Sequence, residues 1–226
     1  MVTVGFTNVM MYQLKELKGK ELKSISCVDD EIKKRKFPRS AYGNLFLCVD
    51  DMYMEIGNLF RSMNYFGNEE DISTLFCELK LRQSECQHYM YTEIAKEYVI
   101  DDIIENIIVI RDKISLYQKE YGVKVVSDNY ELRKEKGEKE IPNVKDLGGI
   151  ELGHYTYNIV LDQALVIKCA NNTYIFERGS LFTEEILIRV NKNYMVEIDS
   201  VEDVKKYWRE GNEGLRIDVE REKIQI

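Results

Sequence analysis

The feature that most constrains this chain is a series of short apolar segments near its C-terminus, separated by pairs of turn-forming residues. Four segments have the length and the Val, Ile and Tyr content of β-strands. They are Tyr155–Val160, Leu165–Cys169, Thr173–Glu177 and Glu185–Val190. Asp162-Gln163 and Asn171-Asn172 separate the first three segments and are typical of tight turns. Because links this short join antiparallel neighbours, we expect a β-meander.

A helix and a last strand follow this meander. The apolar residues of VEDVKKYW (201–208) fall on one helix face, and Asp199 or Ser200 precedes them as an N-cap. Apolar and charged residues alternate over 215–220, which predicts the final strand.

The N-terminal half gives a less regular pattern. Asn8–Leu17 has helical spacing, whereas Asn44–Ile56 contains two apolar runs around Asp50-Asp51, which predicts a hairpin. Asp71–Leu81 predicts a strand with Leu75, Cys77 and Leu79 on one face. Residues 99–116 suit a helix face in part, but their Ile and Val content favours a strand from about residue 106 onward. The expected class is α+β, with mainly antiparallel sheet and a few helices.

A strongly polar segment divides the chain. Residues 128–149 include KEKGEKE and end in Gly-Gly, so they form either a linker or a long surface loop. We therefore expect an N-terminal α+β unit over 1–127 and a C-terminal meander with one helix over 150–226, either as separate domains or packed as one. VDDMYMEI (49–56) also resembles VLDQALVI (160–167), which suggests two related sheet units as a hypothesis.

The charge and cysteine content limit the partners and the compartment. The 226 residues carry 40 acidic and 32 basic side chains, for a net charge of −8. Nucleic acid is therefore not expected as the primary partner, because phosphate binding needs a basic surface. The five cysteines are irregularly spaced, which indicates reduced thiols in the cytoplasm. We see neither a signal peptide nor an apolar run of about 18 residues, so no membrane association is expected.

Sequence motifs give little support for enzymatic chemistry. The chain lacks GxSxG, GxGxxG and GxxxxGK[ST]. Cys77, Cys86 and His88 do not have zinc-ligand spacing, and Cys169, the partner available to His154, ends an apolar strand. We expect no metal and no cofactor.

One enzyme alternative rests on a resemblance. Asp71, Glu78 and Lys80 resemble the PD-(D/E)xK nuclease pattern. That resemblance implies two carboxylates holding a divalent cation and a lysine near the attacked phosphate. Here the aspartate stands closer to Glu-x-Lys than in that family, and the same string recurs at 16–18, 21–23 and 31–33.

The segment TYIFERGSLFTEEILIRV (173–190) gathers charges around Gly179-Ser180. Its carboxylates would suit acid–base chemistry if their pKa values differed. The alternative is cross-strand ion pairing of Glu177 or Arg178 with Glu184 or Glu185 at the solvent end of a hairpin, and strand alternation favours it.

Exposed carboxylates and tyrosines would together form a surface for a basic protein partner. The residues expected to form it are Glu177, Glu184, Glu185, Tyr155 and Tyr157.

The C-terminal third resembles small bacterial toxin-immunity proteins. The similarity lies in FERGSLFTEEILI, a short helix ending in YW, and GLRIDVEREKI. It implies a cytosolic, non-enzymatic inhibitor that binds a basic toxin domain, often a nuclease; it assigns no functional residues. A structural or regulatory interaction protein is a third hypothesis, beside the immunity-type inhibitor and the nuclease.

Overall fold

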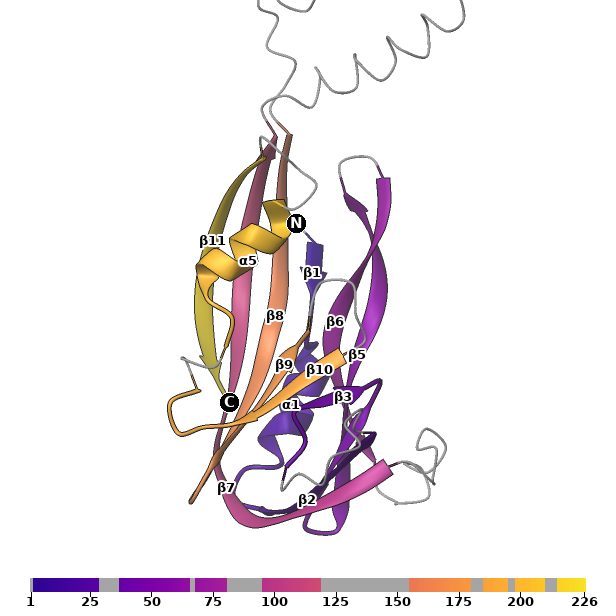
Figure 1. Ribbon diagram of the computed structural model, residues 1–226, viewed down its shortest axis with the longest axis vertical. Helices are drawn as coiled ribbons and strands as arrows, with labels where there is room; N and C mark the ends of the chain where they lie inside the picture. Colours follow the sequence, from indigo (N-terminus) through magenta and orange to yellow (C-terminus); the bar gives the residue numbers. More distant parts are fainter. Residues whose placement is uncertain are drawn as a thin grey trace, which may run out of the picture.

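The protein is a strongly curved, mostly antiparallel sheet with two short helices against it (Figure 1). The computed structural model describes residues 2–28, 37–65, 68–80, 95–118, 155–179, 185–194, 198–209 and 215–226. Within these residues eleven strands form one sheet, and only the pairing of β1 with β8 is parallel. The expected antiparallel, sheet-rich fold is confirmed. The α+β class is only roughly supported, because the described part holds just two helices.

The elements are named here in chain order. They are β1 (Val2–Val4), α1 (Asn8–Lys15), β2 (Glu21–Val28), β3 (Ser40–Tyr42), β4 (Leu45–Val49), β5 (Met52–Tyr65), β6 (Asn68–Lys80), β7 (Ala95–Gln118), β8 (Tyr155–Cys169), β9 (Thr173–Arg178), β10 (Glu185–Val190), α5 (Val201–Arg209) and β11 (Leu215–Gln225).

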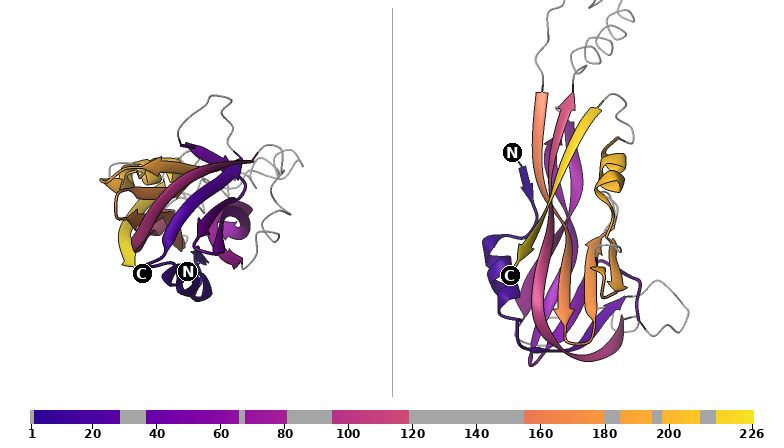
Figure 2. Two further views of the ribbon diagram at one scale, coloured as in Figure 1. Left: turned by 90° about the horizontal axis from the view of Figure 1, so that it is seen from below. Right: turned by 90° about the vertical axis from the view of Figure 1, so that its left-hand side faces the viewer.

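Strand β7 is the central element of the sheet. The strand order is β3-β10-β9-β8-β7-β2-β4-β5-β6, with β1 added on β8 and β11 on β7. The first part of β7 pairs with β2, and the second part pairs with β8 and β11. Register shifts near Asp101 and Glu105 mark two bulges between these parts, and bulges bend a strand. Viewed from below, the sheet curls until the β5–β6 side approaches the β8–β9 side (Figure 2).

The largest apolar cluster lies inside this curl. It combines buried side chains from the two halves of the curled sheet. Leu47, Ile56 and Leu75 come from β4, β5 and β6, and Leu165 and Phe176 from β8 and β9. A second cluster includes Val204 and Trp208 of α5, which stack on the upper half of the sheet. A third cluster includes Ile110, Val166 and Ile175. Burying one side chain of this size contributes roughly 1.5–3 kcal/mol, so these clusters stabilise the fold.

Several predicted elements are confirmed. Asp50-Asp51 joins β4 to β5 in an antiparallel hairpin, and Asp50 has the positive φ of 49° that such turns require. β6 buries Leu75 and Cys77 on the expected face. The predicted helices correspond to α1 and α5, and the predicted final strand to β11.

The turn predicted at Asp162-Gln163 is wrong. β8 runs without a break from Tyr155 to Cys169, and Gln163 is the extra residue of a bulge opposite Ile110 and Arg111. Arg111 binds the Asp162 carboxylate at 2.7 and 3.0 Å, and the Phe6 N–H donates to it at 2.7 Å. The polar pair therefore stays inside the sheet because buried partners satisfy it.

The hypothesis of two related sheet units finds no support. Val49–Ile56 contains the turn between β4 and β5, whereas Val160–Ile167 lies in the middle of β8. The 128–149 segment lies outside the described residues, and the strands on either side of it, β7 and β8, pair with each other. Neither described helix has the length and apolar character needed to cross a membrane.

Candidate functional site

The charges of the 173–190 segment do not lie where we expected them. Glu177 and Arg178 end β9 and have 0% and 2% of their surface exposed, so the solvent-end prediction is wrong for both. Their cross-strand neighbours on β10 are Leu187 and Ile186, not acidic residues. Glu184 lies outside the described residues. Glu185 is half-buried, and its carbonyl oxygen accepts hydrogen bonds from Gly179 and Asn58.

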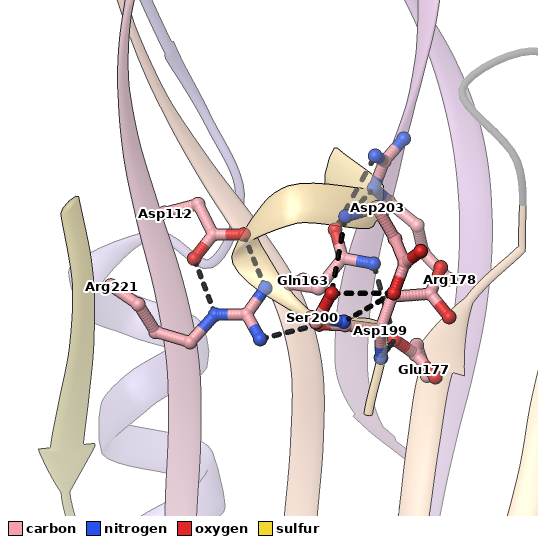
Figure 3. A network of polar contacts seen from close by, with 8 residues as sticks. All are labelled: Asp112, Gln163, Glu177, Arg178, Asp199, Ser200, Asp203 and Arg221. Carbon is pink, nitrogen blue, oxygen red and sulfur yellow. Dashed lines mark hydrogen bonds and ion pairs between the residues drawn. The ribbon is translucent and has the colours of Figure 1, made fainter. Parts of the chain in front are cut away.

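Glu177 lies in a buried polar network (Figure 3). Its Oε1 accepts the Asp199 N–H at 2.9 Å and Gln163 Nε2–H at 3.2 Å, and its Oε2 pairs with Arg189. Burial raises the pKa of Glu177, and the charge of Asp199 adds to this effect. The carboxylate thus joins β8, β9, β10 and the segment before α5.

Arg178 is the fully buried cation of the network. Its guanidinium donates to Gln163 Oε1 at 3.3 and 3.4 Å, and to the Oγ and carbonyl oxygen of Ser73 at 3.3 and 3.5 Å. Burial lowers its pKa to about 10, and the charges of Asp112 and Glu177 oppose that shift. Because Ser73 belongs to β6, Arg178 connects the two sides of the curled sheet.

The network also fixes the start of α5. Arg221 on β11 forms a two-bonded ion pair with Asp112, at 2.7 and 2.8 Å, and donates to the Asp199 carbonyl oxygen. Ser200 caps the helix. Its Oγ accepts the Asp203 N–H at 3.2 Å, and the Asp203 carboxylate accepts the Ser200 N–H at 3.0 Å (Figure 3). These contacts hold α5 on the sheet, which is a structural role.

The nuclease residues do not converge. All three lie on β6, but Asp71 is seven positions from Glu78, which is about 23 Å along an extended strand, and it points to the opposite face. Lys80 contacts Glu78 at 2.7 Å and the buried Glu55 at 3.4 Å, and its pKa is raised chiefly by Glu78. The metal-binding arrangement proposed from the sequence is therefore wrong.

The other candidate residues are buried or lie outside the described part. Burial raises the pKa of Cys77 and of Cys169 to about 12, which keeps both thiols protonated. Cys86, His88 and His154 are outside the described residues. In the described part, no group of three His, Cys, Asp or Glu residues could hold a metal ion.

Of the two tyrosines, the structure describes only the backbone. Tyr155 and Tyr157 lie at the start of β8, where their backbones pair with Gln118 and Leu116 of β7, respectively.

A different surface combines acidic and apolar side chains. The outer face of β7 exposes Glu97, Val99, Asp101, Ile103 and Glu105, which we call the acid–aliphatic stripe. Val99 is 73% exposed and Ile103 is 45% exposed, whereas Asp102 is buried and Ile100 is half-buried. The stripe lies on the part of β7 that curves under the sheet beside β2 (Figure 1).

Sequence reasoning missed this stripe because it placed the strand from residue 106 onward. The sequence signal was ambiguous, because acidic residues recur every four positions at 97, 101 and 105, a spacing that also fits one face of a helix. Comparison of the chain with protein-family models, with curated proteins and with solved structures finds no match.

Proposed function

We propose that this protein is a non-enzymatic, cytoplasmic binding protein of the immunity type, which neutralises a bacterial toxin domain by covering a basic surface. The observation that carries the proposal is the acid–aliphatic stripe on β7. Val99 and Ile103 expose aliphatic surface on this strand face, and the carboxylates beside them would offer a basic partner both an apolar and an acidic contact.

The charge of the whole chain supports the same partner class. With a net charge of −8, the protein attracts basic proteins over a Debye length of about 10 Å at moderate ionic strength. Steering of this kind accelerates association with a basic domain and disfavours nucleic acid. Glu184, Glu185, Tyr155 and Tyr157 remain proposed contributors to binding. Glu177 is withdrawn from that set because it is buried.

The test is co-expression with the product of the neighbouring gene. We expect the protein to restore growth of cells that express this toxin, and to form a stable complex with it at low salt. An unrelated basic protein of similar size serves as the control for nonspecific charge attraction. Failure both to protect cells and to bind the toxin at low salt would contradict the proposed function.

A further inference from the structure

We infer that the acid–aliphatic stripe is the docking face itself, and that its occupant is an extended, basic segment of the partner protein. In this segment, lysine or arginine alternates with aliphatic side chains. The inference rests on the proposed function, because it names the contact surface and the chemistry of the bound segment.

The carboxylates of the stripe are available for a partner. Glu97, Asp101 and Glu105 are exposed, and within the described residues neither Asp101 nor Glu105 forms an ion pair. Glu97 accepts one hydrogen bond from Ser24 Oγ at 2.6 Å, which orients its carboxylate. A cation brought to these positions gains attraction without displacing a cation of the same chain.

The spacing of the stripe suits an extended partner. Acidic residues recur every four positions along the stripe, and so do aliphatic residues. Four positions span at most about 13 Å along a strand. A second strand has a similar rise per residue, so its alternate side chains would meet Glu97 and Val99 one by one. To meet Asp101, Ile103 and Glu105 it would follow the bends of β7 at its two bulges. A helix repeats its face every turn, about 5.4 Å, and does not match this spacing.

Charge argues against the other occupants. A second copy of this chain would place the same carboxylates against each other, and like charges in contact are destabilising. An anionic lipid surface or a nucleic acid would be repelled for the same reason. The aliphatic residues give a basic segment a dry contact at Val99 and Ile103, which are 73% and 45% exposed before binding.

The experiment uses the full chain, labelled with nitrogen-15, and a synthetic peptide as long as the stripe in which lysine alternates with valine. Two further peptides alternate lysine with serine and glutamate with valine. We expect the lysine–valine peptide to shift the amide signals of 97–105 and to bind less tightly as salt is added. The lysine–serine peptide should bind more weakly, and the glutamate–valine peptide should not bind.

Variants separate the stripe from general surface effects. E97K/E105K and V99S/I103S should each weaken binding of the lysine–valine peptide by about tenfold or more. E202K/E220K makes the same charge change on exposed residues away from the stripe, and V9S/Y12S removes exposed apolar side chains from α1. Both controls should bind as the wild type does, and circular dichroism confirms that each variant is folded.

Absence of peptide binding at low salt, signal shifts outside the stripe, or equal affinity of the stripe variants and the controls would overturn the inference. The proposed function fails separately. If the toxin binds the wild type and E97K/E105K equally well, the function stands and the docking face is wrong. If the toxin does not bind while the peptide does, the docking chemistry stands and the proposed function is wrong.

Discussion

At the scale of residues, three of the buried carboxylates each face a guanidinium. Asp112, Asp162 and Glu177 are 0%, 1% and 0% exposed, and they pair with Arg221, Arg111 and Arg189 respectively. Removing an ion from water costs several kcal/mol, which a buried ion pair and its hydrogen bonds offset only in good geometry. These charges therefore position strands against one another, whereas Glu97, Asp101 and Glu105 of β7 face solvent.

The first prediction separates the charge of Glu177 from its hydrogen bonds. E177Q keeps an oxygen that accepts from Asp199 and Gln163 but loses the ion pair with Arg189, so it should lower the free energy of unfolding by about 1 kcal/mol. E177A loses that acceptor and should cost about 2–4 kcal/mol. Urea denaturation measures both, and an equal loss in the two variants would show that the charge matters most.

The raised pKa of Glu177 predicts that the free energy of unfolding depends on pH. The pKa of Glu177 is raised above its ordinary value of 4.5, so the folded state holds the proton more tightly than the unfolded chain. Its contribution to stability is complete below pH 4.5 and is lost as the pH rises through the raised pKa. We expect the free energy of unfolding of the wild type to fall relative to that of E177Q as the pH rises from 4.5 toward neutrality. The opposite slope would contradict the burial of this carboxyl group.

The next prediction concerns the buried ion pair between Asp112 and Arg221. Arg221→Met should lower the free energy of unfolding by about 3–5 kcal/mol, because it leaves the fully buried Asp112 without its ion-pair partner. The double variant D112L/R221M removes both charges and should recover part of that loss. Urea denaturation of both variants and of D112L measures the coupling, and a double variant with the summed loss of the two single variants would show that the pair does not interact.

At the scale of elements, local patterns predicted the strands and helices whose signals lie within a few residues. The β4–β5 hairpin and α5 were predictable because Asp50-Asp51 is a turn pair and Ser200 is a helix cap. The unbroken course of β8 was not predictable, because an Asp-Gln pair in an apolar run fits a turn as well as a bulge. The choice depends on partners such as Arg111 and Arg178, which come from other strands.

The capping contact gives the prediction at this scale. Ser200→Ala removes the side-chain acceptor of the Asp203 N–H, and loss of an N-cap typically costs about 1 kcal/mol. Ser200 also lowers the pKa of Asp203, so the capping contribution is present above the unfolded pKa of Asp203 and is lost as the pH falls through the lowered value. Thermal unfolding should show a lower melting temperature for S200A at both neutral and acid pH, with the larger difference at neutral pH, where the Asp203 carboxylate also accepts from Ser200 Oγ. Ser200→Thr is the matched control and should melt near the wild type.

At the scale of the whole molecule, the curl of the sheet separates the two groups of charges. Arg178 reaches Ser73 across the curl from inside, while the acid–aliphatic stripe occupies the outer side of β7. The sequence predicted an acidic surface, but not which carboxylates face solvent. That difference depends on the bulges in β7 and β8 and on strand order, which form through contacts between residues far apart in the chain.

The most direct test of this account is the salt dependence of the affinity for the toxin domain, measured by calorimetry on the wild type, E97K/E105K and E202K/E220K. We expect wild type and E202K/E220K to bind tightly at low salt and to lose affinity as salt is added. E97K/E105K should bind weakly, with little dependence on salt. An affinity and a salt dependence for E97K/E105K equal to those of E202K/E220K would contradict the assignment of the acid–aliphatic stripe as the binding face.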